Sequence, residues 1–414
     1  MGERRRVVIT GLGAVTPIGP DVPTFWAAAL AGKSGVTTIS SWDVTGHSVT
    51  IAGEIKDFDP STWLPGKEAK RMDRFTQFAV AASDEAVKDS GLDLEAIDPF
   101  RLGVVIGTGI GGIGEMERQD ARLRRGGPAR VSPFLIPKLM PNAAAGNVAI
   151  RYGARGVNFD VTTACASATH AMGEASLAIR RGAADAIITG GSEAGITPLG
   201  IAGFANMKAL STRNDDPATA SRPFDKDRDG FVVGEGGGIV VLEELEHART
   251  RGAHIYAEVA GYAVTCDAHH ITAPDPAGAT AAKTMGLALE DAGLGTKDVS
   301  YINTHSPGTP FGDAMECAAI RLLFGERAEQ PPVSGLKSII GHLLGASGAL
   351  SVIAIALSMR DGKAHPTINQ FTPDPGCDID CIPNEARDLD IRVALSNAFG
   401  FGGHNGTLVL VSAD

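Results

Sequence analysis

A cysteine stands where a predicted strand meets a predicted helix, in the segment Val161-Thr-Thr-Ala-Cys165-Ala-Ser-Ala168. Free backbone N–H groups and the positive end of a helix dipole stabilise a thiolate at such a junction, so we expect the Cys165 sulfur to be nucleophilic near neutral pH. The alternative is a small buried cysteine that only fills space, the commonest fate of a free cysteine.

Two histidines occupy similar positions later in the chain. His305 follows a predicted strand in Tyr-Ile-Asn-Thr-His-Ser-Pro-Gly, and His342 lies at a predicted helix start in Lys-Ser-Ile-Ile-Gly-His-Leu-Leu. Functional groups of α/β proteins gather at the carboxyl ends of strands. A helix N-terminus lowers the pKa of an imidazole, so His342 should stay neutral and donate a hydrogen bond. Either histidine alone could be structural, but with Cys165 they form a candidate reactive site.

A glycine-rich segment near the C-terminus, Ser396-Asn-Ala-Phe-Gly-Phe-Gly-Gly-His-Asn-Gly406, offers backbone chemistry. Glycines permit positive φ and close approach to a ligand, so the N–H groups of this segment could bind an oxyanion. A tight turn between two strands would also explain the glycines. Two phenylalanines, Phe399 and Phe401, are less expected in so flexible a loop and indicate a gate.

The elements that must position these residues alternate between short β-branched runs and longer Ala-rich helical patterns. The predicted strands are Arg6–Thr10, Leu102–Gly107, Val157–Val161, Asp185–Thr189, Ile239–Leu242, Ile255–Ala260, Val299–Asn303, Val393–Ser396 and Thr407–Val411. The predicted helices are Arg74–Ser90, Ala166–Arg181, Ala279–Ala292, Ala314–Phe324 and Leu343–Arg360. This alternation predicts an α/β architecture with sheets covered by helices. Because the order of elements repeats, we expect two similar halves, residues 1–253 and 254–414.

Composition and charge narrow the classes of function. The 414 residues are 43% hydrophobic, which permits a large core and excludes disorder as the main state. A net charge of -11 argues against nucleic acid as a partner. Five cysteines in a chain of this size do not indicate a disulfide framework. The N-terminus lacks a signal-peptide pattern. The apolar stretch Ala349–Met359 is too short to span a bilayer. We therefore expect a soluble, cytoplasmic protein.

Six segments together resemble the β-ketoacyl-acyl-carrier-protein synthases. They are RRVVITGLGAVTPIG, VTTACASATHAMGEA, the stretch Ala209–Gly238, NTHSPGTPFGD, GLKSIIGHLLGASG and NAFGFGGHNG. Each segment alone is a weak signal, but all six follow the order and spacing of the family, most closely those of its synthase II type. The resemblance implies a thiolase-type fold, in which two similar α/β halves form a layered αβαβα arrangement. It also implies a homodimer that uses no cofactor or metal of its own and meets its substrates on the phosphopantetheine of an acyl carrier protein.

The resemblance implies five catalytic residues. Cys165 would accept the acyl chain, and His305 and His342 would assist malonyl decarboxylation and stabilise the enolate oxygen. Lys337 would act near them in an electrostatic and structural role. Phe401 would act as a gate, and its N–H would form an oxyanion hole together with that of Cys165.

The substrate-binding residues implied by the resemblance surround this set. Thr309 would bind the pantetheine arm, Phe399 and Phe231 would line the malonyl side, and Ile110 would lie at the acyl-chain pocket. One position departs from the family, where His-Gly-Thr-Ser-Thr-Pro is usual: here Pro307 replaces the first threonine and loses both a hydroxyl and an N–H. We therefore expect a weaker contact with the carrier arm.

Two further groups of residues remain: Asp313 and Glu316 match family positions, and a set of cations, of which Lys208 and Arg130 are favoured by the resemblance, could meet the carrier protein. Asp313 and Glu316 also fit a capping-box-like helix start, so we interpret Asp313 as structural and leave the role of Glu316 open. An acidic carrier protein needs clustered cations on a chain of net negative charge. The candidates, which could instead be ordinary solvated residues, are Lys67, Lys70, Arg71, Arg130 and Lys208.

The implied activity is that of a 3-oxoacyl-acyl-carrier-protein synthase, a decarboxylative Claisen condensation. Loss of CO2 supplies a carbanion without a strong base, and the enolate requires neutral or cationic donors. A polyketide-type ketosynthase remains an alternative. A cysteine thioester hydrolase would not require His342 or Lys337. A thiolase would need a second cysteine in the C-terminal glycine segment, and a non-catalytic carrier-binding subunit normally lacks the cysteine.

Overall fold

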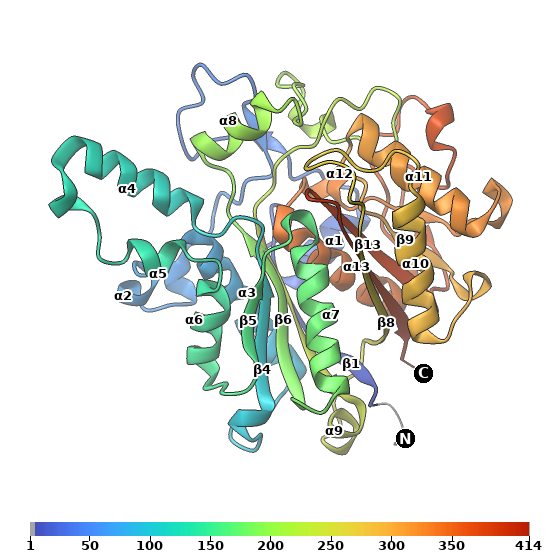
Figure 1. Cartoon of the computed structure of the whole chain (residues 1–414), viewed down its shortest axis with the longest axis horizontal. Helices are drawn as coiled ribbons and strands as arrows, with labels where there is room; N and C mark the ends of the chain where they lie inside the picture. Colours follow the sequence, from blue (N-terminus) through green and yellow to red (C-terminus); the bar gives the residue numbers. More distant parts are fainter. Residues whose placement is uncertain (1–4, 414) are drawn as a thin grey trace.

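The computed structural model describes residues 5–413, and a ten-stranded sheet forms its centre (Figure 1). The strands of the N-terminal half are β1 (Val7–Val15), β4 (Leu102–Gly107), β5 (Asn158–Val161), β6 (Ala186–Glu193) and β7 (Gly236–Glu244). Those of the C-terminal half are β8 (Ala257–Cys266), β9 (Tyr301–Asn303), β10 (Val333–Ser334), β13 (Val393–Gly400) and β14 (His404–Ser412). The order across the sheet is β10-β9-β13-β14-β8-β1-β7-β6-β4-β5.

The two halves of the sheet repeat one topology. In the first, β1 and β6 flank β7 in antiparallel pairs, and β4 lies parallel to both β6 and β5. In the second, β8 and β13 flank β14 in antiparallel pairs, and β9 lies parallel to both β13 and β10. The predicted duplication is therefore confirmed at the level of topology. The halves join through a short antiparallel pairing of Val8 and Ile9 with Glu258 and Ala257.

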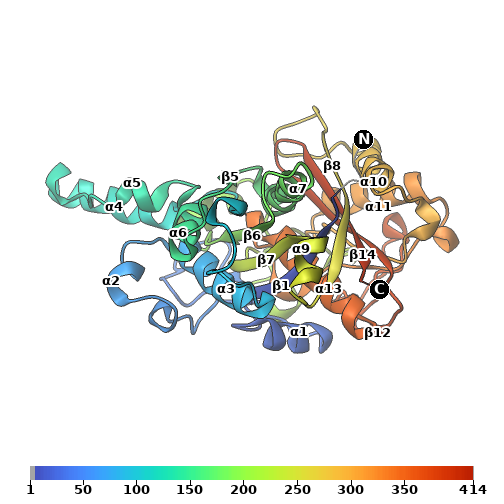
Figure 2. The ribbon, with the colours of Figure 1, turned by 90° about the horizontal axis from the view of Figure 1, so that it is seen from below.

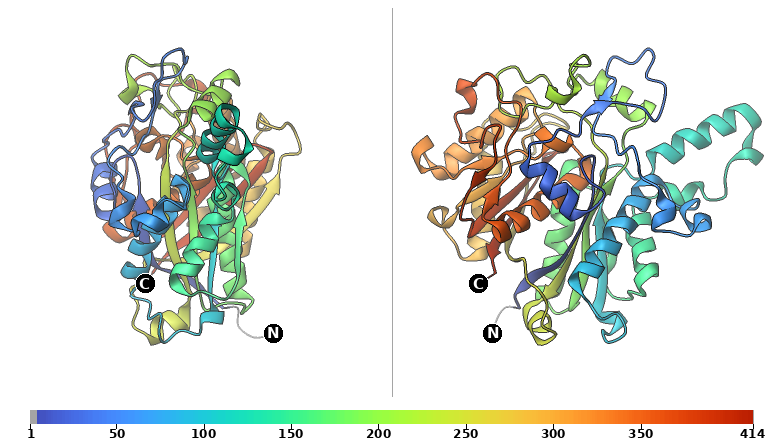
Figure 3. Two further views of the ribbon diagram at one scale, coloured as in Figure 1. Left: turned by 90° about the vertical axis from the view of Figure 1, so that its left-hand side faces the viewer. Right: turned by 180° about the vertical axis from the view of Figure 1, so that it is seen from behind.

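Helices form the outer and middle layers. They are α1 (Val22–Leu30), α2 (Gly66–Ala69), α3 (Arg74–Ser90), α4 (Ile113–Gly126), α5 (Leu135–Leu139), α6 (Ala143–Tyr152), α7 (Ser167–Arg180), α8 (Pro198–Asn206), α9 (Leu245–Thr250), α10 (Ala279–Ala292), α11 (Pro310–Phe324), α12 (Lys337–Ile340) and α13 (Ser347–Asp361). α3 and α6 pack on the N-terminal half, α10 packs on the C-terminal half with α11 beside it, and α7 and α13 contact strands of both halves. Figures 1 and 3 show the resulting αβαβα layers.

The middle helices can occupy this position because small and apolar residues cover them on all sides. Every residue of α13 from Ser347 to Ser358 is buried, and most of α7 is buried as well. A helix that is apolar all round belongs in a core or in a membrane. The prediction considered only Ala349–Met359, which is too short to span a bilayer, but the helical stretch extends over Leu344–Asp361. By length and composition this longer stretch could cross a membrane, but 83% of it is buried inside the fold. It is a core helix.

The predicted strands and helices are all present, and α3 and α10 have the predicted bounds. β1 continues to Val15 although we expected it to end at Thr10, before two glycines. These glycines are needed for packing, because a Cβ at Gly11 or Gly13 would lie 2.2 or 1.9 Å from a backbone oxygen of α3. Two short two-stranded sheets lie outside the central sheet. One pairs β2 (Thr37–Thr38) with β3 (Ile51–Ala52), and the other pairs β11 (Lys363–Ala364) with β12 (Arg387–Asp388). The arm formed by α4 and α5 projects from the body (Figure 2).

Candidate active site

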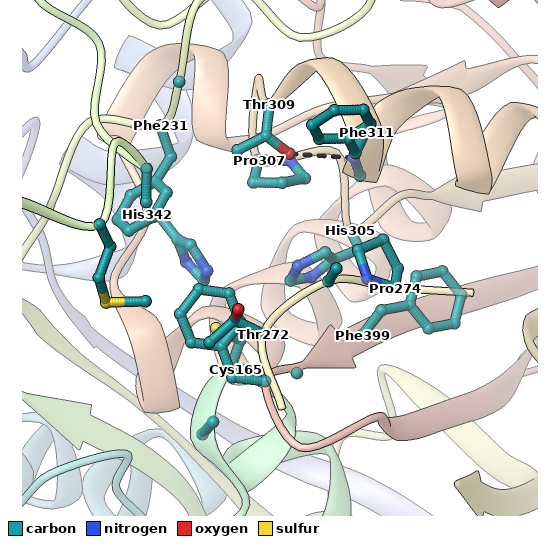
Figure 4. A pocket seen from close by; sticks show the side chains of 18 of the residues that line it. Cys165, Phe231, Thr272, Pro274, His305, Pro307, Thr309, Phe311, His342 and Phe399 are labelled. Atoms are coloured by element: carbon teal, nitrogen blue, oxygen red, sulfur yellow. Dashed lines mark hydrogen bonds between the residues drawn. The ribbon is translucent and has the colours of Figure 1, made fainter. Parts of the chain in front are cut away.

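One cavity of about 610 Å³ brings together most of the predicted site residues (Figure 4). Cys165, His305, His342 and Phe401 line it, as do Thr309, Phe399, Phe231, Ile110 and Lys208. Figure 4 shows the imidazoles of His305 and His342 directed toward the same space above Cys165. Lys337 is absent from the cavity wall and lies behind His305, where its Nζ donates a hydrogen bond to the His305 carbonyl oxygen.

These side chains meet because each follows a strand of the repeated topology. Cys165 lies in the 3-10 turn Ala164–Ala166 between β5 and α7, and His342 lies between β10 and α13, the equivalent position in the second half. His305 follows β9, which is parallel to its neighbours β10 and β13. Parallel strands end at one edge of a sheet, so residues that follow them share a crevice. The pseudo-symmetry thus turns the nucleophile and both imidazoles toward one another.

The turn that carries Cys165 is held by local hydrogen bonds. Ser167 Oγ accepts from the Thr163 N–H at 2.9 Å, and it lies 2.6 Å from the Ala164 carbonyl oxygen and 3.1 Å from that of Thr108. Ala164 adopts a φ of +50°, a left-handed conformation that non-glycine residues seldom take. Such a conformation persists only where its surroundings enforce it, and it is a common feature of functional sites.

The protonation state of Cys165 differs from the sequence-based prediction. Burial raises the pKa of the Cys165 thiol to about 11, although Lys337 and the backbone N–H groups of Phe401 and Cys165 act to lower it. The charge of Glu193 raises it further. Desolvation disfavours a thiolate more strongly than a few N–H dipoles favour it. Burial therefore favours the thiol form of Cys165, opposite to the thiolate near neutral pH that the sequence predicts.

The two histidines face each other with ring centroids 5.4 Å apart. His342 Nδ1 accepts a hydrogen bond from the Leu344 N–H at 3.2 Å and lies 2.9 Å from Ser347 Oγ. In the neutral ring the proton therefore sits on Nε2. Burial lowers the pKa of both His305 and His342 well below 6.5, and the nearby Lys337 charge lowers it further. This direction agrees with the predicted neutral state of His342, and its cause is burial: α13 begins only at Ser347, so His342 is not at the start of that helix.

Behind His305, a buried lysine and a buried carboxylate fix the loop. Glu316 accepts from the backbone N–H groups of His305 at 2.9 Å and Ser306 at 2.7 Å, and also from Asn397 Nδ2 at 3.2 Å. Burial lowers the pKa of Lys337 to about 8, while the charge of Glu316 holds it up. Glu316 therefore orients the His305 loop, and its charge favours the protonated form of Lys337.

Asp313 lies one turn before Glu316 on α11 and also holds the loop that follows His305. Its carboxylate accepts from the N–H groups of Gly308 at 3.0 Å and Phe224 at 2.9 Å. This confirms a structural role for Asp313 but not the predicted capping box. The N-cap of α11 is Thr309, whose side chain accepts from the Gly312 N–H at 3.1 Å. The Thr309 oxygen thus faces the helix start as well as the cavity (Figure 4).

The glycine-rich segment forms the turn between β13 and β14. Gly402 and Gly403 have φ of +86° and +75°, and a Cβ at Gly400 would lie 2.8 Å from the Thr163 carbonyl oxygen. The turn can therefore approach the Cys165 turn only because it is built from glycine. The Gly402 N–H donates to the Ile271 carbonyl oxygen at 2.7 Å, so the turn is attached to a second loop.

That second loop was not foreseen from the sequence. Asp267, Thr272, Ala273 and Pro274 line the cavity beside the glycine turn. No motif marked these residues, because the loop acquires its role only through its contact with β13–β14. Glu193, a buried carboxylate whose charge acts on Cys165, was also missed, because it lies four residues beyond the predicted strand Asp185–Thr189 and is reached only by the longer observed strand β6.

Aromatic side chains shape the rest of the cavity. The Phe231 ring centroid lies 5.3 Å from that of His342 and 5.4 Å from that of Phe204, and the Phe399 ring lies 5.9 Å from His305. Each contact is edge-to-face, a favourable aromatic geometry. Ile110 lies with Phe204 and Phe231 in one apolar cluster on the N-terminal side. These residues therefore give the cavity an apolar wall.

The predicted cationic residues are all exposed but do not lie together. Lys208 lines the cavity, whereas Lys67, Lys70, Arg71 and Arg130 do not. The first three lie on or next to α2, and Arg130 lies in the turn that follows α4. The Arg71 guanidinium is 5.2 Å from the Phe134 ring centroid, which attaches the α2 region to the projecting arm.

The arrangement can support acyl transfer followed by enolate chemistry. A cysteine thiol with two N–H groups directed at its sulfur is equipped to form an acyl thioester. Two neutral imidazoles, with a protonated lysine behind them, can donate hydrogen bonds to an oxygen that becomes negative. Among the residues that the structure describes, no group of three or more His, Cys, Asp or Glu side chains could hold a metal ion.

Known proteins resemble this chain along its whole length. The sequence models for the N-terminal and C-terminal domains of β-ketoacyl synthase match residues 4–248 and 256–371. The 3-oxoacyl-[acyl-carrier-protein] synthase 2 of Staphylococcus aureus is 53% identical over 409 residues, which are 99% of both chains. The protein of that name from Synechocystis is 51% identical over 406 residues, 98% of both chains.

Solved structures agree with these sequence matches. A type II polyketide ketosynthase in complex with its acyl-carrier protein is 37% identical, with a TM-score of 0.93 over 100% of both chains. A β-ketoacyl synthase from Burkholderia phymatum is 37% identical, with a TM-score of 0.92 over 99% of this chain and 100% of that one. The fold is thus the thiolase-type fold of ketosynthases, and the chain belongs to the β-ketoacyl synthase family.

Proposed function

We propose that this protein is a 3-oxoacyl-[acyl-carrier-protein] synthase of the fatty-acid elongation type. It condenses an acyl chain held on Cys165 with a malonyl group held on acyl carrier protein and releases CO2. The observation that carries the proposal is the single cavity lined by Cys165, His305 and His342, with the imidazole rings 5.4 Å apart. The names of the relatives that match along the whole chain support it.

In the first half-reaction, the Cys165 sulfur attacks the thioester carbonyl carbon of an acyl carrier. A bond from carbon to the Cys165 sulfur forms, the bond to the pantetheine sulfur breaks, and the thiol proton leaves with the pantetheine thiol. The backbone N–H groups of Cys165 and Phe401 act on the same sulfur and are suited to an oxyanion beside it. Because the thiol has a raised pKa, proton removal has to accompany the attack.

In the second half-reaction, a malonyl carrier binds in the same cavity and loses CO2. The enolate oxygen that results accepts hydrogen bonds from His342 Nε2–H and from His305, and the Lys337 charge lies behind them. The enolate carbon attacks the acyl carbonyl, the bond to the Cys165 sulfur breaks, and that sulfur takes up one proton. Neutral imidazoles suit this step, because a carboxylate in their place would repel the enolate.

Substrate contacts and partners follow from the same site. Thr309 and Pro307 would meet the pantetheine arm, Phe399 and Phe231 the malonyl group, and Ile110 the acyl chain. A relative with a bound acyl-carrier protein supports such a partner here. We propose docking on Lys208 at the cavity, with the more distant cations extending the surface: Lys67, Lys70, Arg71 and Arg130. We further propose that the protein is a cytoplasmic homodimer. Each chain would divide into its two similar halves near residue 253.

Two other activities are less well supported. A polyketide-type ketosynthase shares the fold, but the relatives named 3-oxoacyl-[acyl-carrier-protein] synthase 2 are 51–53% identical, whereas the polyketide structure is 37% identical. A cysteine thioester hydrolase would explain Cys165 and His305. It would leave His342, held in one tautomer at the cavity wall, without a role.

Mass spectrometry of the intact protein tests the proposal. Incubation with an acyl-carrier thioester should add the acyl mass to Cys165, and later addition of malonyl carrier should remove it with release of CO2 and a carrier-bound chain two carbons longer. The variant C165A should acquire no adduct. Free fatty acid without an elongated product would refute condensation and identify a hydrolase instead.

A further inference from the structure

Glu193 is a carboxylate buried inside the protein at the end of β6, with none of its surface exposed. One carboxylate oxygen, Oε2, accepts from the N–H of Gly109 at 2.6 Å and from the N–H of Gly345 at 3.0 Å. The other oxygen, Oε1, accepts from Thr108 Oγ1 at 3.0 Å and from the Ile110 N–H at 3.3 Å. The residue therefore ties a loop of the N-terminal half to a turn of the C-terminal half.

The two glycines make this close contact possible. A Cβ at Gly109 would lie 2.8 Å from Glu193 Oε2, and one at Gly345 would lie 2.8 Å from the same oxygen and 2.1 Å from the Gly109 nitrogen. A real Cβ does not approach backbone so closely, so a side chain at either position would push the loop and the turn apart. Glu193 Oε2 accepts from the N–H groups of both glycines, so the carboxylate bridges the loop and the turn at their point of closest approach.

Both segments that Glu193 holds carry parts of the site. Gly109 and Ile110 line the cavity, and Ile110 belongs to its apolar wall with Phe204 and Phe231. The turn Leu344–Ala346 contains Gly345, and its Leu344 N–H fixes the tautomer of His342. Leu344 itself has a φ of +46°, a strained conformation for a branched side chain. The carboxylate thus sets the separation between the acyl-chain wall and the imidazole that faces the enolate.

The charge of Glu193 would be costly in a purely structural role. Its partners in the described structure are backbone N–H groups and one hydroxyl, with no lysine or arginine among its hydrogen-bond partners. Burial raises the pKa of Glu193 to about 7, and its charge opposes ionisation of Cys165. A buried charge without a counter-ion lowers stability, so a role in the site explains it better than a role in the scaffold.

We propose that Glu193 is a positioning residue of the condensation site, one that holds Ile110 and the His342 turn in register across the two halves. This inference deepens the proposed function and rests on it. Through these contacts Glu193 acts on the second half-reaction, which needs His342, more than on acyl transfer to Cys165.

The test compares E193Q and E193D with wild type and with a matched control, E243Q. Glu243 is equally buried and accepts from Thr10 Oγ1 at 2.6 Å and from Arg251, but it lies in β7 outside the cavity. We expect E193Q to lower the rate of malonyl-carrier decarboxylation by about tenfold to a hundredfold with little change in KM, because misplacement of a donor is felt in the chemical step. Alkylation of Cys165 by iodoacetamide should become faster between pH 8 and 10, because a negative charge near the sulfur is lost.

E193D separates position from charge. Its carboxylate keeps the charge but is one methylene shorter, so it cannot reach both Gly109 and Gly345. We expect it to lose decarboxylation rate while the alkylation profile of Cys165 stays as in wild type. E243Q should lower the melting temperature and leave both readouts unchanged.

Three results separate the outcomes. Decarboxylation rates within twofold of wild type in both Glu193 variants would overturn the inference, and so would equal losses of rate in E193Q and E243Q. If wild type makes no 3-oxoacyl product while E193Q still shifts the alkylation profile, the proposed function fails and the influence of Glu193 on Cys165 stands.

Discussion

Replacing Glu316 with glutamine should slow condensation far more than acyl transfer. Each oxygen of Glu316 accepts one backbone N–H of the His305 loop, from His305 at 2.9 Å and from Ser306 at 2.7 Å. An amide can accept at only one of the two positions and presents an NH2 group to the other. The His305 loop therefore loses one hydrogen bond to a charged group, whereas the Cys165 turn is held by other residues.

The size of the effect follows from that bond. A hydrogen bond to a charged group contributes about 1.5–3 kcal/mol. If this is expressed fully in the transition state, condensation should slow by about tenfold to a hundredfold. A second effect concerns pH: the pKa of Lys337 is about 8 and is held up by Glu316, so without that charge the ammonium is lost at lower pH. The alkaline limb of the pH–rate profile for condensation should therefore move to lower pH.

The assay measures both half-reactions of E316Q across pH 6 to 10. Acylation of Cys165 by an acyl carrier is followed by mass spectrometry, and condensation by CO2 release. E235Q is the control, because Glu235 is similarly buried but is paired with Arg74 outside the cavity. An E316Q enzyme with an unmoved alkaline limb and a condensation rate within twofold of wild type would refute the reasoning.

Three further changes test other parts of the site. H342A should lower decarboxylation by about a hundredfold or more, since a donor to the enolate is lost, and should leave acylation of Cys165 within a fewfold of wild type; equal loss in both steps, measured by mass spectrometry, would contradict this. K208E should lower activity with acyl-carrier substrates about threefold to tenfold at low salt and less at high salt, while short soluble thioesters should react as before; a loss independent of salt would count against docking. P307T should lower KM for the carrier by restoring a hydroxyl and an N–H beside Thr309, and an unchanged KM in steady-state kinetics would reject a contact with the arm.

Much of the local structure was accessible from the sequence because it depends on local patterns. α3 and α10 have a clear helical period, and their predicted bounds are those observed. The strand before Cys165 and the strand before His305 were found from β-branched runs ended by Pro, Gly or small residues. The predicted end of a strand was wrong where an element distant in sequence determines it. β1 continues through Gly11 and Gly13 because α3 packs against it.

The electrostatics of the site could not be obtained in this way. The helix position of Cys165 suggested a thiolate, but burial among residues distant in sequence raises its pKa to about 11. The roles of Glu316 and Glu193 depend equally on distance in space. Glu193 lies 152 positions from Gly345, one of its partners, and no local pattern connects them.

The sequence by itself determined which groups are present and at which strand and helix ends they stand: a cysteine, two histidines, a lysine and a glycine-rich turn. Only the tertiary structure decided that these ends meet, since that depends on two halves joined through a short pairing of β1 with β8. It also decided which groups are charged, because the cost of ionisation depends on solvent and neighbours that folding alone brings together or removes.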